Sequence, residues 1–368
     1  MIVFGSVKKY LSILLLVLTL CEMGMTPPRI RVVILKNQSK VVVEGEDLVP
    51  LFPNKRLEIE GTAQGFNING ISFLRTRELT LQSLKNPLTM EGKNFIGKLE
   101  IHNDNQNKLT VVNDLPLEEY LIGLVQKEIS ETWPTESIKA QAVAARTYAL
   151  LKQKERNKNG DALYDVEATT EDQVYEGIGK EDWVIQKAVQ ETAGEVLWYL
   201  GFFPAYYHSC CGGNTELASH VWERKENSNS VADPFCKDSP KFFWEYRISK
   251  NDLLKKLRKE ELRGKRILSL NLTSSKGSPR VGTVEIKTDQ ALIFLRGTDF
   301  RSILGNTNLR STWFTAKASG SDYIFHGRGY GHGVGMCQWG AKGMSEEGKT
   351  YQEILEFYYP KALIKKIY

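Results

Sequence analysis

One glutamate continues the apolar stripe of an expected helix. Leu117, Leu121, Leu124 and Glu128 are separated by four, three and four positions, which is the spacing of one helix face. A carboxyl group on an apolar face loses solvation, and this raises its pKa toward the range that a general acid needs. The stripe can also end one turn earlier, with Glu128 solvated at the helix C-terminus near Trp133. The spacing therefore makes Glu128 a candidate catalytic acid and leaves the solvated alternative open.

Glycine occupies every second position from Gly327 to Gly335, within the segment from His326 to Met344. Alternate residues of a strand share a face, so an extended conformation would leave one face without side chains. The other face would carry Arg328, Tyr330, His332, Val334 and Met336. Because glycine weakens a strand, the pattern indicates close approach by a second backbone or a ligand. We expect a strand that lines a site, although a tight strand crossing or a flexible loop also explains the glycines.

A histidine and three cysteines offer metal-ligand chemistry. They are His208, Cys210, Cys211 and Cys236, and His220 can be added to them. Zinc accepts imidazole and thiolate ligands, with an open fourth position leaving room for water. A disulfide between Cys236 and one of the adjacent cysteines explains the same residues, while geometry disfavours a bond between Cys210 and Cys211 themselves. The spacing leaves both interpretations open.

The composition indicates a folded, exported protein. The chain has 368 residues, of which 41% are hydrophobic, so it can build a sizeable core. Its net charge of +5 is not concentrated in a basic tract, so nucleic acid is not an expected partner. The positive charge is compatible with binding to an anionic polymer such as a bacterial cell wall. Lys8 and Lys9 precede an apolar run, Tyr10 to Leu20, that is too short to span a bilayer. We expect residues 1–25 to be a signal peptide or an N-terminal membrane anchor, and the membrane to be contacted only there.

Local patterns place these residues on distinct elements. Short β-type runs separated by turn signals fill the chain up to Asp114, and helical periodicity then continues from Leu115 to Gln153. Pro116 and Pro134 stand near the first turns of two successive helices, where proline is tolerated. Val281 to Thr288 and Ala291 to Gly297 predict a hairpin. We expect an α+β fold with a β-rich part (29–114), a two-helix catalytic block with a groove (115–245) and a part with the Gly-rich segment (246–368), including an embedded or following smaller α/β subdomain.

Three sequence blocks occur in a recognisable order. They are LPLEEYLIGLVQKEI with PTESIKAQAVAARTYAL, then AYYHSCCGGNT, then GRGYGHGVGMCQWGAKGM with ILEFYYP. Together they resemble the stage II sporulation protein D family, which also includes amidase-enhancer proteins, and the match runs from about Ile30 to Tyr359. The resemblance implies a peptidoglycan lytic transglycosylase that cuts glycan strands between N-acetylmuramic acid and N-acetylglucosamine. It also implies a partner amidase that strips the stem peptides from these strands, and a role in division, sporulation or wall remodelling.

The resemblance assigns roles to individual residues. The family's catalytic glutamate ends the pattern YLxGxVxxE, and this position is Glu128. Zinc-binding members carry a histidine and cysteines near HSxCGG, which implies His208 and Cys211 as zinc ligands, with Cys236 as the second thiolate. Cys337 stands where relatives usually have serine, and we expect no catalytic role for it. The expected substrate-binding residues are Arg146, Tyr148, Tyr175, Tyr330, His332, Gln338 and Trp339. The competing interpretation of Arg146 is a structural salt bridge. The competing interpretation of the aromatic residues is that they pack in the core.

The implied reaction needs one catalytic carboxyl group. Glu128 would protonate the glycosidic oxygen, and its carboxylate would then deprotonate the muramoyl C6 hydroxyl, which attacks the anomeric carbon and yields a 1,6-anhydro sugar. Since the substrate supplies the nucleophile, no second carboxylate is required, unlike in paired-carboxylate glycosidases. Three alternatives remain: a non-catalytic wall-binding activator of an amidase, a water-using muramidase with Glu131 or Asp172 as partner carboxylate, and a zinc hydrolase centred on His208.

Overall fold

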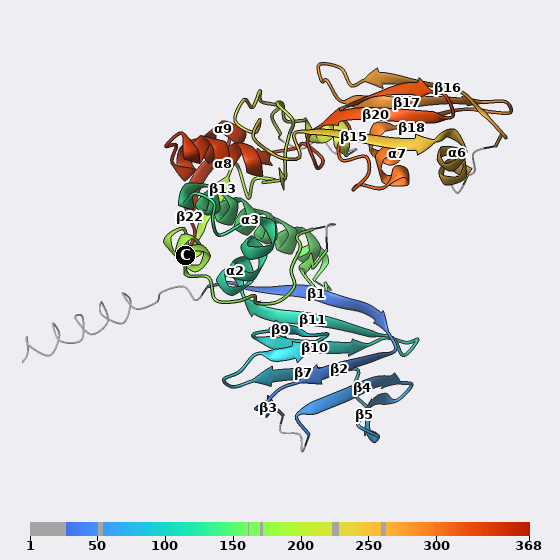
Figure 1. Cartoon of the computed structure of the whole chain (residues 1–368). Helices are drawn as coiled ribbons and strands as arrows, with labels where there is room; N and C mark the ends of the chain where they lie inside the picture. Colours follow the sequence, from blue (N-terminus) through green and yellow to red (C-terminus); the bar gives the residue numbers. More distant parts are fainter. Residues whose placement is uncertain (1–26, 51–53, 161, 170–171, 223–227, 259–262) are drawn as a thin grey trace, which may run out of the picture.

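The computed structural model describes residues 27–50, 54–160, 162–169, 172–222, 228–258 and 263–368. The expected signal peptide or anchor, residues 1–25, lies outside the described residues. Figure 1 shows three regions that follow one another through an elongated molecule: β-sheets in blue and cyan, a helical layer in green, and a mixed region in orange and red. Helices and mixed sheets thus combine in one chain, which confirms the expected α+β class.

The β-rich region consists of two six-stranded sheets. Its strands are β1 (Arg29–Gln38), β2 (Lys40–Glu44), β3 (Leu48–Val49), β4 (Arg56–Thr62), β5 (Gly65–Ile68), β6 (Ile71–Leu74), β7 (Glu78–Ser83), β8 (Leu88–Met90), β9 (Lys93–Phe95), β10 (Lys98–Asn103), β11 (Leu109–Pro116) and β12 (Val166–Glu167). One sheet has the order β12-β1-β11-β10-β7-β3, and the other β6-β5-β4-β2-β8-β9. Asn69 and Gly70, both with positive φ, turn β5 into β6, as the turn signal predicted. Strand β11 leads directly into the first of the described helices.

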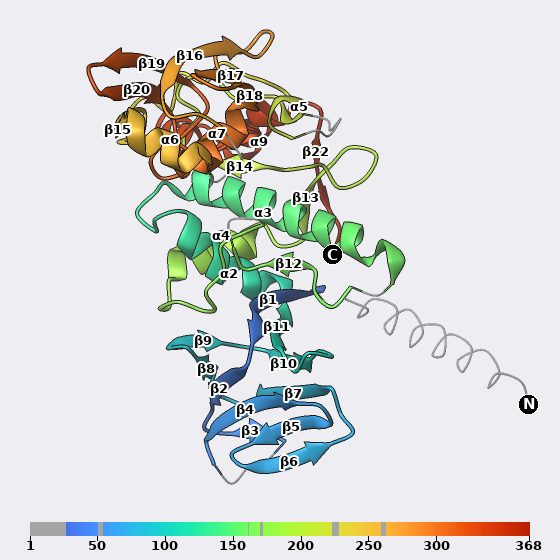
Figure 2. The ribbon, with the colours of Figure 1, turned by 90° about the vertical axis from the view of Figure 1, so that its right-hand side faces the viewer.

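Two helices carry the centre of the molecule, α2 (Leu117–Glu128) and α3 (Thr135–Arg156). Pro116 and Pro134 occupy their N-cap positions, which confirms the predicted helix starts. Helix α2 buries its leucine stripe, and α3 buries a row of alanines that lets neighbouring elements approach closely. A short 3₁₀ helix, η1 (Asn157–Asn159), ends α3, and α4 (Trp183–Glu191) completes the layer. Figure 2 shows α3 between the sheets below and the C-terminal elements above.

The C-terminal half returns to this helical layer. Its elements are β13 (Glu195–Trp198), β14 (Tyr207–His208), α5 (Ala218–Val221), β15 (Phe243–Ser249), α6 (Lys250–Arg258), β16 (Ile267–Ser274), β17 (Val281–Thr288), β18 (Leu292–Arg296), α7 (Gly297–Leu304), β19 (Phe314–Ser319), β20 (Asp322–Arg328), β21 (Met336–Cys337), α8 (Gln338–Glu346), α9 (Tyr351–Tyr358) and β22 (Leu363–Lys366). Strands β17 and β18 pair antiparallel, which confirms the predicted hairpin. Strand β14 pairs in parallel with β21, so the chain between them forms an excursion with its own aromatic core around Phe300, Phe314 and Phe325. After that excursion, α8 and α9 pack on α3.

The Gly-rich segment differs from its prediction. Only Gly327 lies in a strand, because β20 ends at Arg328, and the glycines that follow adopt positive φ, from +71° at Gly335 to +113° at Gly331. An alternating strand was therefore the wrong conformation. The predicted close approach is present, since a Cβ added at Gly329 would lie 2.6 Å from the carbonyl oxygen of Cys210. None of the described helices combines the length and apolar character needed to cross a membrane.

Candidate active site

Glu128 lies at the end of α2 and is only partly exposed. The side-chain amide of Gln338, at the start of α8, donates a hydrogen bond of 2.9 Å to Oε2 of Glu128. Burial raises the pKa of Glu128 above its ordinary value of 4.5, while hydrogen bonds from Gln338 and the Val174 backbone act in the opposite direction. The carboxyl group is thus desolvated, yet part of the residue reaches solvent. This combination suits a group that holds a proton and delivers it to a bound molecule.

A chain of buried polar groups lies beside this carboxyl group. The hydroxyl of Tyr120 donates to Oε1 of Gln173 at 3.0 Å, and Nε2 of Gln173 donates to the hydroxyl of Tyr207 at 2.9 Å. Burial raises the pKa of both tyrosines well above 10, and the nearby Glu128 charge raises them further. Both hydroxyls therefore stay neutral. Gln173 and Tyr207 were not among the expected site residues, and no local spacing pattern marks them.

Two tryptophan rings contact each other, one from the chain after α2 and one from the start of α8. Trp133 follows α2, Trp339 is next to Gln338, and their ring centroids are 5.2 Å apart in an edge-to-face arrangement. Both rings keep exposed area, and Lys342 places its ammonium 5.4 Å from the Trp339 ring centroid. Accessible aromatic faces are surfaces on which the C–H groups of sugars can pack. Trp133 was absent from the expected binding set, although its position shortly after Glu128 was the available signal.

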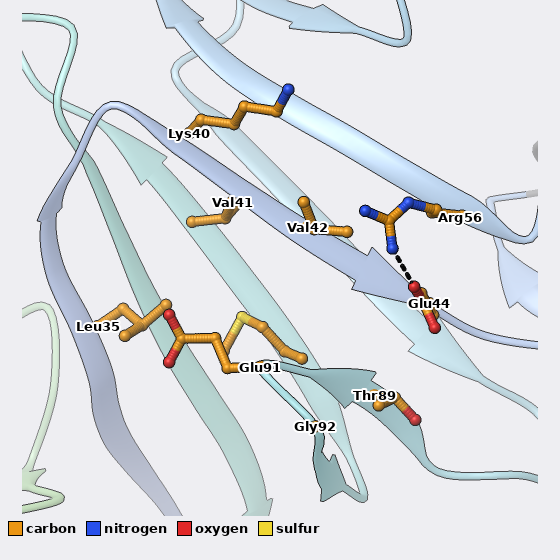
Figure 3. Close-up of a pocket in the computed structure, with 10 residues that line it drawn as sticks. Leu35, Lys40, Val41, Val42, Glu44, Arg56, Thr89, Glu91 and Gly92 are labelled. Carbon is orange, nitrogen blue, oxygen red and sulfur yellow. Dashed lines mark hydrogen bonds and ion pairs between the residues drawn. The ribbon is translucent and has the colours of Figure 1, made fainter.

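A separate hollow of about 350 Å³ lies on the β-rich region (Figure 3). Its charged lining residues include Lys40, Glu44, Arg56 and Glu91, and Figure 3 shows the ion pair between Arg56 and Glu44. Both of its carboxylates keep substantial exposed area. Exposed ion pairs of this kind contribute about 0–1 kcal/mol and are ordinary surface features. The desolvated carboxyl of Glu128 is the stronger candidate for chemistry.

A second group of reactive side chains lies among the C-terminal elements. Donor atoms of Cys211, Asp233, Cys236 and Cys337 lie within 4.8 Å of one another, and all four residues are buried. The four cysteines of the described residues are free thiols, so this structure contains neither of the disulfides considered from the sequence. Sulfur and carboxylate donors in a buried cluster of this size fit a metal ion such as zinc.

Comparison with known proteins agrees with the sequence blocks. A family model described as stage II sporulation protein matches residues 105–199, which include Glu128, and a model of a domain of unknown function matches residues 216–335. Stage II sporulation protein D of Bacillus subtilis is 34% identical over 265 residues, covering 67% of this chain and 74% of the relative. This chain belongs to the stage II sporulation protein D family.

Two further relatives extend the comparison across the family. An uncharacterized protein of Brachyspira hyodysenteriae is 33% identical over 325 residues, covering 85% of this chain and 83% of the relative. The amidase enhancer of Bacillus subtilis is 30% identical over 328 residues, but the matched part is only 45% of its length. Members that resemble this chain over most of its length therefore carry names connected with sporulation and with amidase stimulation.

In this member of the family, three expected substrate-binding residues lie in the core. Arg146 has no exposed side-chain area and donates two hydrogen bonds, of 2.8 and 2.7 Å, to the carboxylate of Glu118. Tyr148 and Tyr175 are 6% and 2% exposed, and their hydroxyls donate to core side chains. These contacts favour the competing interpretations, a structural salt bridge for Arg146 and packing in the core for the two tyrosines.

The remaining expected residues divide into two places. Gln338 contacts Glu128, and Trp339, the next residue, contacts Trp133. His332 and Tyr330 lie on the positive-φ glycine segment: His332 packs on Trp222 with centroids 5.1 Å apart, and Lys241 lies 4.7 Å from the Tyr330 ring centroid. Burial lowers the pKa of His332 to about 3, so its ring is neutral at ordinary pH.

The expected metal ligands are only partly brought together. Cys211 and Cys236 belong to the buried cluster, but His208 does not. Its Nδ1 lies 3.1 Å from the carbonyl oxygen of Val334, and burial lowers its pKa well below 6.5. The other two members of the cluster are Asp233, which was not among the expected ligands, and Cys337, for which no catalytic role was expected. The correction has a simple cause: neighbours in sequence, such as His208 and Cys211, need not point to the same side of the chain.

Proposed function

We propose that this protein is an exported lytic transglycosylase that acts on peptidoglycan glycan strands, with Glu128 as its catalytic acid and base. The observation that carries the proposal is the desolvated, partly accessible carboxyl group, with its raised pKa and its amide donor Gln338. The names of the relatives, which refer to sporulation and to amidase enhancement, support a cell-wall substrate and an amidase that acts on the same material. The net charge of +5 is compatible with an anionic wall.

The first chemical step uses the protonated form of Glu128. Burial keeps the proton on the carboxyl group at a pH where a solvated glutamate is ionised. The proton passes to the glycosidic oxygen while the bond from that oxygen to the muramoyl anomeric carbon breaks, and oxocarbenium character develops on the sugar. The amide of Gln338 stabilises the carboxylate that forms, because it donates to one carboxyl oxygen. Trp133 and Trp339 offer ring faces for the flanking sugars.

The second step returns the proton to Glu128. Its carboxylate takes the proton of the muramoyl C6 hydroxyl, and that oxygen attacks the anomeric carbon, which closes the 1,6-anhydro ring. Glu128 is then protonated again, and the cycle needs neither water nor a second carboxylate. The surroundings of Asp172 favour this route over a water-using muramidase, since its carboxylate is held by Tyr148 at 3.0 Å and by Arg156 at 2.8 Å.

Product analysis tests the proposal. Purified protein is incubated with amidase-treated glycan strands, and the chain ends are identified by mass spectrometry, with Glu128→Gln as the test variant. Glu131→Gln is the matched control, because this exposed glutamate lies three positions further along. Anhydro-muramoyl ends are expected from the wild type and from Glu131→Gln, and not from Glu128→Gln.

A second function has an observation behind it, since one relative is named an amidase enhancer. If neither the wild type nor the variants release products, while all of them bind the strands, the protein is a non-catalytic activator that holds the wall for an amidase. If chelation abolishes activity and Glu128→Gln retains it, the zinc-hydrolase alternative replaces the transglycosylase.

A further inference from the structure

Three segments that are distant in sequence meet at the buried cysteine cluster. Cys211 lies in the loop after β14, Asp233 and Cys236 lie in the loop before β15, and Cys337 ends β21 and caps α8. The sulfur atoms of Cys211 and Cys236 are 3.4 Å apart, and Oδ2 of Asp233 lies 3.0 Å from the sulfur of Cys211. Exposed area is 0% for each cysteine and 1% for Asp233. Four donors thus face one another where water is excluded.

Backbone N–H groups point at these sulfur atoms. The amide of Cys211 lies 3.2 Å from the sulfur of Cys337, and the amide of Gly340 lies 3.3 Å from the same sulfur. The amide of Gly213 lies 3.4 Å from the sulfur of Cys211. Donors directed at sulfur stabilise a thiolate more than a thiol, and such outer contacts orient the ligands of metal centres.

Asp233 is oriented in the same way. The hydroxyl of Tyr358 donates to its Oδ2 at 3.0 Å, and the amide of Phe235 donates to its Oδ1 at 2.9 Å. A carboxylate that is fixed at both oxygens cannot rotate away from the sulfur atoms. Its position is therefore set before any ion arrives.

A buried cation supplies an independent indication of negative charge. Arg280 is 1% exposed and donates to the carbonyl oxygen of Cys211 at 2.6 Å, while its Nε and Nη1 have no partner among the described residues. A buried guanidinium needs negative charge nearby, because the loss of hydration is otherwise uncompensated. The other contacts of Arg280 are with the carbonyl oxygen of Asn214 at 3.3 Å and with the Trp313 ring, whose centroid lies 5.9 Å away, and the nearby carboxylate of Glu216 supplies part of the negative charge. Thiolates held around a divalent ion next to Cys211 would supply further negative charge, which neutral thiols do not.

We propose that Cys211, Asp233, Cys236 and Cys337 bind one zinc ion in a closed structural site, and that His208 is not a ligand of it. Four protein donors complete the tetrahedral coordination that zinc adopts in structural sites, and three soft thiolates favour zinc over oxygen-seeking ions such as magnesium. The nominal charge of the loaded centre is −2, from one divalent ion, three thiolates and one carboxylate, and the positive charge of the neighbouring Arg280 offsets part of it.

The position of Cys337 connects this centre with Glu128. Cys337 is the N-cap of α8, and the next residue, Gln338, donates to Glu128. An ion bound to Cys337 would therefore fix the start of α8 and hold Gln338 against the carboxyl group. The ion would position Gln338, and it would take no part in the proton transfers at Glu128.

Metal analysis of the full chain tests the ligand set. We expect about one zinc ion per chain in the wild type and in His208→Gln, and its loss in Cys236→Ser and Cys337→Ser. Retention of zinc by Cys337→Ser together with its loss from His208→Gln would overturn the assignment. So would a wild-type protein that contains no metal and has a Cys211–Cys236 disulfide.

Cobalt replacement keeps the test valid if a serine variant does not fold. The wild-type protein loaded with Co²⁺ should show thiolate-to-cobalt charge-transfer absorption and the visible bands of a tetrahedral ion. Absence of these bands would overturn the proposal without any variant. Since both readouts are independent of glycan cleavage, a failure of the metal site can be told apart from a failure of the proposed enzyme activity.

Discussion

Removal of the Gln338 amide should move the titration of Glu128 in a defined direction. The hydrogen bond from Gln338 to Oε2 stabilises the ionised form, so it lowers the pKa that burial has raised. A hydrogen bond to a charged group contributes about 1.5–3 kcal/mol, and one pKa unit corresponds to about 1.4 kcal/mol. We therefore expect Gln338→Ala to raise the pKa of Glu128 by about 1–2 units.

The assay is the pH profile of kcat/KM for glycan cleavage, which reports the pKa of the free enzyme's acid. The reactive form of Glu128 is protonated, so activity is lost as pH rises through its pKa. The fall in activity at alkaline pH should therefore move to higher pH by the same amount, about 1–2 units, in Gln338→Ala. The maximal rate of this variant should be lower as well. Gln126→Ala is the matched control, because Gln126 lies on the same helix and donates to the Lys180 carbonyl oxygen instead. An alkaline limb that stays in place, or moves to lower pH, would refute the role given to Gln338.

Three other expectations concern stability. The folded-state pKa of Glu128 is raised above 4.5, so the wild-type protein loses stability as pH rises from 4.5 through the folded-state pKa. Glu128→Gln should therefore have the same Tm as the wild type in acid and a higher Tm at neutral pH. An equal Tm difference between the two proteins at both pH values would contradict the raised pKa. Arg146→Ala should lower the free energy of unfolding in a denaturant titration by about 3–5 kcal/mol, because it leaves the carboxylate of Glu118 without its buried partner, and a loss below about 1 kcal/mol would argue for an exposed pair. Gly335→Ala should lower the free energy of unfolding more than Gly348→Ala in the same titration. Both glycines have positive φ, but only a Cβ at Gly335 would meet a backbone carbonyl group. Similar losses of unfolding free energy in the two variants would show that the backbone near Gly335 relaxes easily.

The sequence predicted those features that depend on neighbours along the chain. Proline positions and the leucine stripe located α2 and α3, and the same stripe pointed to Glu128. The hairpin of β17 and β18 was found because each strand carries its own pattern. These signals act over a few residues, where one sequence suffices to read them.

Features that depend on distant segments were missed or misassigned. Trp133 meets Trp339 only because the chain returns to α2 at α8, and Gln173 is placed by contacts with Tyr120 and Tyr207. Cys337 joins the cysteines through the pairing of β14 with β21, and Asp233 through the loop before β15. The Gly-rich segment failed for a different reason: the period-two rule assumes an extended backbone, whereas the freedom of glycine at positive φ allowed a loop.

The most direct test of the central claim is the origin of the new chain end. Amidase-treated glycan strands are digested in water labelled with ¹⁸O, and the muramoyl ends are analysed by mass spectrometry. The account predicts 1,6-anhydro ends without label from the wild type, and no new ends from Glu128→Gln. Reducing ends that carry ¹⁸O would show that water is the nucleophile and would contradict the intramolecular mechanism at Glu128.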